Sequence, residues 1–212
     1  MEKALDLCHL YGAKAFITMN TLLTDRELPE AMAYARFLYR AGADALIVCD
    51  MGLIQGLRRE LPDLPLHGST QLGIGDIPGA RLLQRLGFSC GVLARETSLS
   101  SIAAIRRAVD LPLEAFVHGA LCMSFSGACL YSSMAGERSG NRGTCAQPCR
   151  KPCALNRRPG EGDYALSLSD LCMLEHLGDL EKSGVSWLKI EGRMKRPAYV
   201  AGVTAAYRAA LD

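Results

Sequence analysis

Six of the chain's nine cysteines lie between positions 122 and 172, and their thiols could together bind a metal centre. They are Cys122, Cys129, Cys145, Cys149, Cys153 and Cys172. Four thiolates can hold an iron–sulfur cluster or a tetrahedral zinc ion. Structural zinc usually takes two close cysteine pairs, whereas only Cys145 and Cys149 form a close pair here, and Cys122 and Cys129 are widely spaced. The spacing therefore favours a [4Fe–4S] cluster, and zinc and redox-active or unliganded thiols are the alternatives.

Charge and composition limit the partners. The 212-residue chain has a formal net charge of +2, which is too small to attract nucleic acid through bulk electrostatics. Residues 1–15 carry charges where a signal peptide needs an apolar run, and no segment approaches the length of a membrane-spanning helix. We therefore expect a cytoplasmic protein with no membrane partner. Thiols stay reduced in that compartment, and an odd number of cysteines fits a disulfide framework poorly.

Polar side chains recur where apolar, strand-like runs end. His118 ends one such run four residues before Cys122, and Glu191 ends another between Lys189 and Arg193. At the rim of a barrel, a histidine could carry protons or bind metal, and a carboxylate could bind substrate. The alternatives are a hydrogen-bonded histidine and a carboxylate that is paired with its basic neighbours.

Basic residues form two groups, and the first of them interleaves with the cysteines. The groups are Arg138, Arg142, Arg150, Lys151, Arg157 and Arg158, followed by Lys189, Arg193, Lys195 and Arg196. Such patches bind RNA phosphates through counterion release. Charge alone favours the alternative of a solvated surface. The interleaving with the cysteines is what supports an RNA partner.

Short apolar runs predict the strands that position these residues, at 14–20, 45–50, 64–70, 91–96, 113–119 and 187–193. Helical patterns lie between them, for example at 98–109 and 169–184. Repeated βα units predict a parallel sheet, and polar residues at the strand ends favour a TIM-type barrel. We therefore expect an α/β fold, a parallel (β/α) barrel with six of its eight units. The chain starts on a helical pattern, so we expect residues 1–212 to be one N-terminally truncated barrel domain.

Residues 120–165 interrupt this alternation. They show no clear period and hold most of the clustered cysteines. Loops of this length within compact domains are usually functional or disordered. We expect a Cys-rich insertion before the last strand, lying over the C-terminal mouth of the barrel.

At these residues the chain resembles peptidase family U32, the collagenase-like proteases. The resemblance is carried by FVHGALCMSFSGACLYSS, GERSGNRGTCAQPCR and WLKIEGRMKRPAYV, with support upstream from FITMNTLLTDREL, HGSTQLGI and VLARETSL. It implies either proteolysis or, as in bacterial members, iron–sulfur-dependent hydroxylation of RNA bases or of a quinone precursor. The GNRGTCAQPCR segment is most similar to the branch that hydroxylates rRNA cytidine and tRNA uridine.

The resemblance also implies ligands. Cys122, Cys129 and Cys145 correspond to cluster ligands, and we take Cys149 as the fourth, with Cys172 and then Cys153 as alternatives. The predicted function is hydroxylation of a pyrimidine base in rRNA or tRNA. We predict that His118 and Glu191 are catalytic, and that the substrate is bound by Asn141, Arg142, Arg150 and Arg193.

Two other functions are alternatives. The first is a collagenase-like peptidase, although the chain has no H-E-x-x-H zinc motif and no G-x-S-x-G nucleophile elbow. The second is a non-catalytic subunit of a quinone-precursor hydroxylation system. Besides RNA, the expected partners are a small-molecule hydroxyl donor and a further protein.

Overall fold

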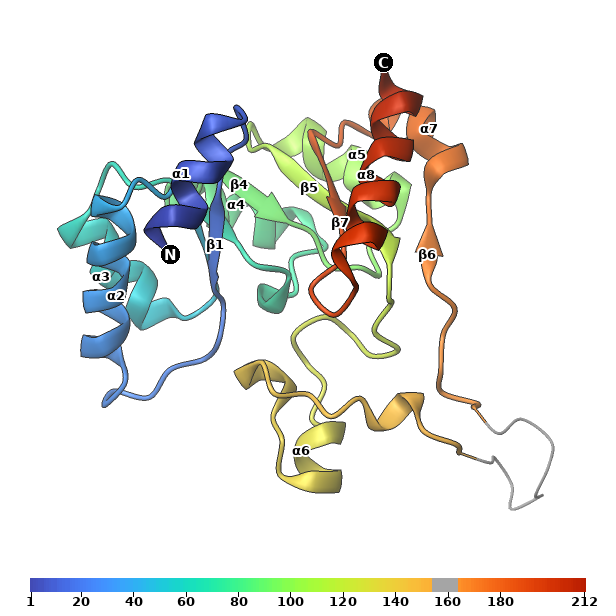
Figure 1. The fold of residues 1–212 in the computed structure, drawn as a ribbon, viewed down its shortest axis with the longest axis horizontal. Helices are drawn as coiled ribbons and strands as arrows, with labels where there is room; N and C mark the ends of the chain where they lie inside the picture. The colour runs from blue at the N-terminus through green and yellow to red at the C-terminus, as the bar shows by residue number, and fades with distance from the viewer. Residues whose placement is uncertain (154–163) are drawn as a thin grey trace.

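The computed structural model describes residues 1–153 and 164–212, which fold around one curved sheet (Figure 1). The strands are β1 (Phe16–Met19), β2 (Ala45–Val48), β3 (Leu66–Gly68), β4 (Cys90–Val92), β5 (Leu113–Gly119), β6 (Leu171–Cys172) and β7 (Trp187–Ile190). The helices are α1 (Glu2–Leu10), α2 (Leu28–Arg40), α3 (Met51–Glu60), α4 (Ile77–Arg85), α5 (Leu99–Ala108), α6 (Tyr131–Gly136), α7 (Leu177–Ser183) and α8 (Pro197–Leu211). The predicted residues Arg157 and Arg158 lie outside the described residues.

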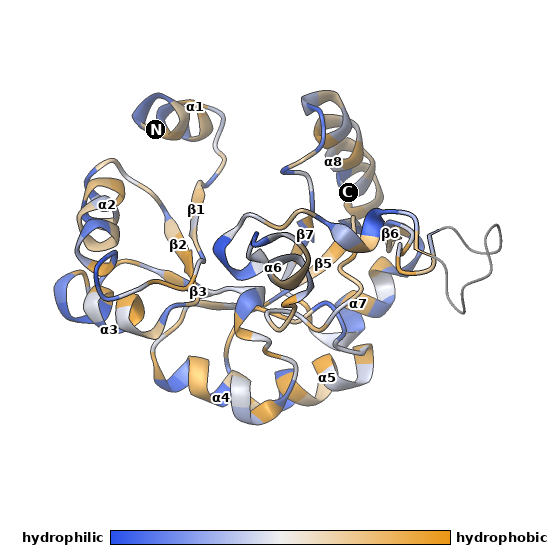
Figure 2. Cartoon of the chain, turned by 90° about the horizontal axis from the view of Figure 1, so that it is seen from below, coloured by the Kyte–Doolittle hydropathy of each residue, from blue (hydrophilic) through white to orange (hydrophobic). Residues whose placement is uncertain are grey.

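The sheet confirms the predicted α/β class. Parallel pairing runs in the order β1-β2-β3-β4-β5-β7, and these six strands are the six that the sequence predicts. The strands curl into a half-barrel. Helices α2, α3, α4, α5 and α7 surround its outer face, and α1 and α8 flank the open side (Figure 2). The carboxyl ends of the six strands therefore meet at one end of the molecule.

Side-chain caps start several of the helices that follow the strands. Asp50 accepts a hydrogen bond from the Leu53 amide (2.9 Å) and begins α3, and Asp76 accepts from the Gly79 amide (2.8 Å) and begins α4. Each cap satisfies an amide that has no partner within its helix. Within the described residues, no helix combines the length and hydropathy needed to cross a membrane.

One predicted helix is shorter in the structure than the sequence suggests. Residues 169–184 were expected to form a single helix, but α7 begins only at Leu177. Before it, β6 pairs antiparallel with β5, with Cys172 opposite His118. The Met173 amide then donates to the Val117 carbonyl (3.0 Å). Because β5 supplies these hydrogen bonds, tertiary pairing overrides the helical pattern of this segment.

The hydrophobic core lies between the sheet and the outer helices. It consists mainly of leucine and isoleucine, and Leu38, Leu53, Leu57, Leu83 and Ile105 are at most 2% exposed. A smaller cluster joins β5, α7 and α8 through Val117, Leu180 and Tyr207. These two clusters hold the strands rigidly, so that loops at the strand ends are placed on a fixed support.

Inside the half-barrel, aromatic rings connect its two edge strands. Phe16 on β1 stacks on Trp187 of β7, with ring centroids 5.1 Å apart. His67 on β3 meets both rings edge-on, at 4.7 and 5.3 Å. Phe16 and Trp187 each begin their strand, so this contact fills the end of the barrel opposite the mouth.

Truncation of Trp187 tests this aromatic contact. We expect Trp187→Ala to lower the free energy of unfolding by about 3 kcal/mol, because it leaves a cavity between β1 and β7. The matched control is Phe37→Ala on α2, whose exposed ring stacks on Tyr34 at the surface, and which should cost less than about 1 kcal/mol. Urea denaturation followed by circular dichroism measures both. Equal losses would contradict a role for Trp187 in joining the edge strands.

Candidate functional site

A cavity of about 500 Å³ opens at the carboxyl ends of the strands. The barrel contributes Asn20 after β1, Ser69 after β3, Arg95 after β4, Phe116 on β5 and Glu191 after β7. The Cys-rich loop contributes a further part of the wall, and residues 189–195 contribute another. A cavity of this size at this end of a parallel barrel is where ligands usually bind.

Four loop cysteines share this cavity. Its lining includes Cys122, Cys129, Cys145 and Cys149, which are the four predicted ligands. The two alternative ligands, Cys153 and Cys172, lie elsewhere. Cys153 forms an isolated backbone β-bridge with Tyr164, and Cys172 lies on β6 opposite His118. Burial raises the pKa of the Cys149 thiol, Arg150 partly offsets this, and the neighbouring thiols of Cys122 and Cys145 raise it again.

Partly buried hydrogen bonds fix the first half of this loop to the barrel. Glu96 accepts from both the amide (2.9 Å) and the hydroxyl (2.8 Å) of Ser126, and Ser126 Oγ accepts from the Arg95 amide (3.1 Å). Gly127 follows with φ of +78°, and a Cβ there would lie 2.2 Å from the Gln71 carbonyl oxygen. Only glycine can approach the backbone so closely, so Cys122 and Cys129 are tied to the loops after β3 and β4.

Two arginines anchor the second half of the loop. Arg142 forms an ion pair with Glu27 and donates to the Leu22 carbonyl (2.6 Å). Arg150 donates to the Leu121 carbonyl (2.6 Å) and to the Ser167 hydroxyl (3.0 Å). The sequence analysis predicts both as substrate contacts, and in the structure both guanidinium groups bind the protein itself.

The other two predicted substrate residues line the cavity. Asn141 lines the cavity, and its backbone is anchored because its carbonyl accepts a hydrogen bond from the Leu22 amide (3.3 Å). Arg193 lies at the rim, and its amide donates to Glu191 Oε1 (3.4 Å). No side-chain hydrogen bond or ion pair engages the Arg193 guanidinium within the part of the chain that the structure describes.

Glu191 belongs to a network of charged side chains. The sequence did not indicate that Arg95 and Glu114 are part of it. Arg95 pairs with it (3.4 Å) and stacks over the Phe116 ring, 4.0 Å from the centroid. Lys189 lies 5.5 Å from the same centroid and pairs with Glu114 (2.7 Å). Glu114 and Phe116 are two residues apart on β5, and this spacing could have indicated that both face the barrel interior.

His118 does not line the cavity. A register irregularity separates Phe116 from His118 where β5 pairs with β7, and such bulges turn side chains to a new direction. The His118 ring lies against α8 instead, with Nδ1 3.4 Å from the Tyr207 hydroxyl. That hydroxyl donates to the Val117 carbonyl (2.8 Å).

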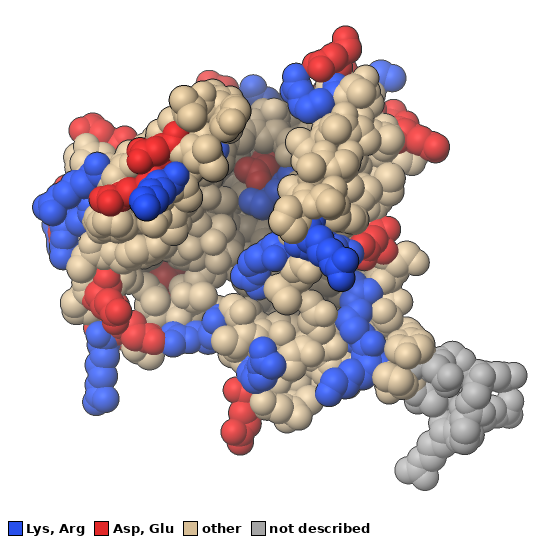
Figure 3. All heavy atoms as spheres, in the orientation of Figure 1, with Lys and Arg blue, Asp and Glu red and all other residues tan. Residues whose placement is uncertain are grey.

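The cavity lining is strongly basic. It includes five basic residues, Arg95, Arg150, Lys189, Arg193 and Lys195, and a single acidic residue, Glu191. In Figure 3, Lys and Arg side chains lie within the central hollow and along its lower edge on this face of the molecule. Glu114 and Asp170, just outside the lining, pair with Lys189 (2.7 Å) and Lys195 (2.9 Å), and the smaller excess of positive charge that is left favours an anionic ligand.

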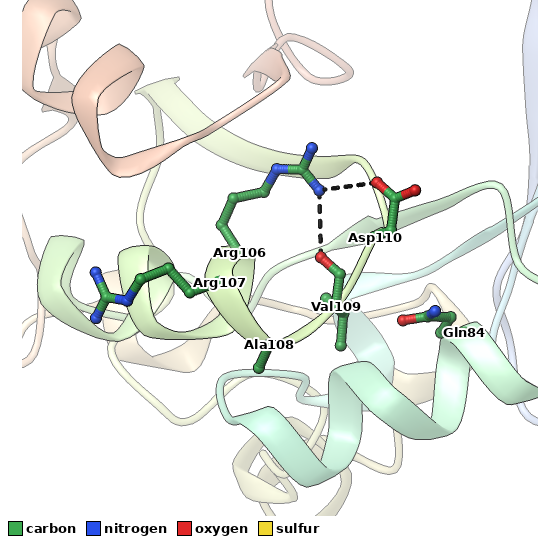
Figure 4. Close-up of a pocket in the computed structure, with 6 residues that line it drawn as sticks. All are labelled: Gln84, Arg106, Arg107, Ala108, Val109 and Asp110. Carbon is green, nitrogen blue, oxygen red and sulfur yellow. Dashed lines mark hydrogen bonds and ion pairs between the residues drawn. The ribbon is translucent and has the colours of Figure 1, made fainter.

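A second hollow lies at the opposite end of the strands and lacks this chemistry. It is lined by Gln84 and residues 106–110 and has a volume of about 430 Å³ (Figure 4). Arg106 donates there to the Val109 carbonyl (3.2 Å) and pairs with Asp110 (3.5 Å), while Arg107 points away from both. No cysteine contributes to its lining.

Two sets of side chains could hold a metal. No three of the four cavity cysteines bring their sulfurs within 4.8 Å of one another in the described structure. A tetrahedral zinc site needs sulfurs about 3.8 Å apart, so the four cysteines do not form one in the described arrangement. Deeper in the barrel, ligand atoms of His67, Cys90 and Glu114 do lie within 4.8 Å of one another, and all three residues are buried.

The comparisons with known proteins identify relatives of the whole chain. The model of a family described as peptidase family U32 matches residues 1–212. The chain is 44% identical to a 23S rRNA 5-hydroxycytidine synthase of Escherichia coli, over 96% of this chain and 31% of that protein. It is 33% identical to tRNA hydroxylation protein P1 of Bacillus subtilis, over 100% of this chain and 53% of that protein.

Other relatives carry protease names. An uncharacterized protease of Methanocaldococcus jannaschii is 38% identical over 96% of this chain and 52% of that protein. Among solved structures, a U32 peptidase matches 92% of this chain and 76% of its own, with a TM-score of 0.61 and 15% sequence identity. That likeness supports the fold. The chain spans between a third and about half of the length of these curated relatives.

The ion pair of Glu27 with Arg142 gives a pH-dependent prediction. The Arg142 guanidinium holds the pKa of Glu27 well below its usual range. The pair therefore stabilises the fold above the ordinary carboxyl pKa, and this contribution declines as pH falls toward the lower pKa of the folded state. We expect Glu27→Gln to lower the urea midpoint at pH 7, with a smaller difference from the unsubstituted protein at pH 3. A difference that stays constant across this range would contradict it.

Proposed function

Because the chain belongs to peptidase family U32, we propose that its cavity binds a pyrimidine base of RNA for hydroxylation at an iron–sulfur centre. One observation carries the proposal: the four cysteines and the five basic residues line the same cavity. Relatives that cover 96–100% of the chain are named for rRNA or tRNA hydroxylation. The chain spans only part of their length, so the activity of the whole protein remains part of the proposal.

The cysteines fit a cluster better than they fit a single ion. Cys122, Cys129, Cys145 and Cys149 would hold it, because all four line the cavity and no three of their sulfurs converge on one point in the described structure. The Gln147 amide donates to Cys145 Sγ (3.3 Å), and such hydrogen bonds tune cluster potentials. When bound, the cluster would supply one-electron chemistry. Cys172 and Cys153 lie outside the cavity lining, which supports Cys149 as the fourth ligand.

The residues of the barrel would bind and orient the base. The planar guanidinium of Arg95 is fixed on Phe116, and RNA bases stack readily on arginine planes. Glu191 is the single carboxylate among the described lining residues, and it would accept a proton or a hydrogen bond from the ring. Arg193 at the rim would contact phosphate, and Lys195 beside it forms an ion pair with Asp170 (2.9 Å). His118 would act from outside the cavity, by holding β5 against Tyr207.

The target base would have to leave its stack to reach this site. A cavity of about 500 Å³ holds one nucleotide but not a duplex. Enzymes that modify bases therefore extrude the nucleotide or act on single strands. The basic rim would hold the flanking phosphates while the base enters. We further propose that residues 1–212 act as one domain, in which the Cys-rich loop closes the mouth.

Cluster ligation is tested by serine substitution. After anaerobic purification, we expect visible absorption and an EPR signal on reduction from the unsubstituted protein. Cys149→Ser should lose most of the iron, because a thiolate ligand is removed. Cys172→Ser and Cys153→Ser are the matched controls and should keep at least about three quarters of it. A colourless protein with stoichiometric zinc and no iron would refute the cluster.

Base hydroxylation is tested by mass spectrometry of rRNA and tRNA from a strain that lacks the gene. A hydroxypyrimidine should disappear and return when the intact gene is supplied. We expect Glu191→Gln to restore less than about a tenth of it, since the ring would lose its proton acceptor. Glu181→Gln, an exposed residue of α7, is the control and should restore it fully. An unchanged RNA profile, together with gelatin cleavage by the pure protein, would favour a peptidase instead.

A further inference from the structure

Below the cavity, three neighbouring strands bring three different metal-ligating groups together. His67 on β3 and Cys90 on β4 are register partners, and Glu114 lies on β5, beside β4. Register partners on adjacent parallel strands point to the same face of a sheet. The three residues are at most 6% exposed, and their ligand atoms all lie within 4.8 Å of one another.

The spacing suits one ion. Three atoms at most 4.8 Å apart leave a point between them no more than about 2.8 Å from each, whereas zinc binds nitrogen, oxygen and sulfur at about 2.0–2.3 Å. Side-chain shifts of about half an ångström would therefore complete the coordination. Imidazole, thiolate and carboxylate together are typical ligands of zinc and of similar divalent transition metals, not of magnesium or calcium.

A second observation points to a ligand at this place. His67 is 3% exposed, and its Nδ1 atom has no hydrogen-bond partner in the described structure. A buried polar atom without a partner is rare in folded proteins and calls for an explanation. The rings of Phe16 and Trp187 cover His67 from below, so they fix its orientation but offer it no acceptor.

The Lys189 ammonium group would compete with a metal ion for the Glu114 carboxylate. This ammonium group lies 2.7 Å from Glu114 Oε1 and neutralises the carboxylate. The Lys189 side chain is 26% exposed and also lines the cavity, so it has a path away from Glu114 toward the mouth. A divalent ion bound by one thiolate and one carboxylate is already neutralised, and the ammonium would then be surplus beside it.

We propose that His67, Cys90 and Glu114 form a buried site for one divalent transition-metal ion of the zinc and iron(II) class, with Lys189 as its competitor. None of the three ligands lines the cavity, and none belongs to the Cys-rich loop. The site is therefore separate from the proposed cluster and does not depend on the proposed function. An ion there ties β3, β4 and β5 together in the interior of a half-barrel.

Cobalt(II) is the probe for this site, because thiolate ligation gives it intense absorption in the near ultraviolet. The metal-free full-length protein with serine at Cys122, Cys129, Cys145 and Cys149 is titrated, so that the loop does not contribute. We expect one equivalent to bind with a thiolate band, and excess zinc to displace it. Cys90→Ser should abolish the band, and Cys49→Ser, also buried but outside the group, should keep it.

Lys189→Met separates a metal site from a general packing role. Removal of the competing ammonium should tighten cobalt binding by at least about tenfold and raise the melting temperature only when metal is present. His67→Gln should weaken binding by at least about a hundredfold, and it serves as the second ligand variant if Cys90→Ser does not fold. A cobalt band that survives Cys90→Ser, or weaker binding after Lys189→Met, would overturn the proposal.

Discussion

The attachment of the Cys-rich loop to the barrel is the constraint on which the site depends. Within residues 120–153, the only buried residues are two serines, Ser126 and Ser132, so this segment has no hydrophobic core of its own. Both serines accept hydrogen bonds, Ser126 from the Arg95 amide and Ser132 from the Ala146 amide (2.8 Å). The loop is held by polar contacts whose geometry is specific, and these contacts place its cysteines over the strand ends.

Such anchoring explains why so many charged residues near the mouth are already paired. A loop without apolar burial needs directional contacts to offset its conformational entropy, and charge-assisted hydrogen bonds are the strongest available. Glu96 accepts from the Ser126 amide, Arg142 donates to the Leu22 carbonyl, and Arg150 donates to the Leu121 carbonyl at the start of the same loop. Arg95, Lys189 and Lys195 are likewise each paired with a carboxylate, which leaves Arg193 at the rim as the lining guanidinium with no side-chain partner among the described residues. Anchors and ligand contacts are different residues, although both kinds stand close together in the sequence.

The sequence predicts the strands better than the directions of side chains near the mouth. Six apolar runs suffice for the six parallel strands, because strands buried on both faces have a strong pattern. His118 could not be placed in the same way, since a bulge in β5 depends on pairing with β7 and leaves no local signal. The two-residue strand β6 could not be predicted either, because it forms by pairing with β5 and its own sequence has a helical pattern. Charge alone also cannot tell Arg142, bound to Glu27, from Arg193 at the rim.

The interior of the half-barrel is arranged in layers that follow position along the strands, as in closed barrels. Phe16 and Trp187 close the far end, His67, Cys90 and Glu114 lie above them, and Phe116 with Arg95 forms the floor of the cavity. Lys189 alone belongs to two layers, because it pairs with Glu114 and also lines the cavity. Any change in the charge around Glu114 therefore acts on the position of Lys189, and through it on the electrostatic potential at the cavity floor. The buried donor set and the cysteine-lined cavity share no ligand, and Lys189 is the side chain that contacts both.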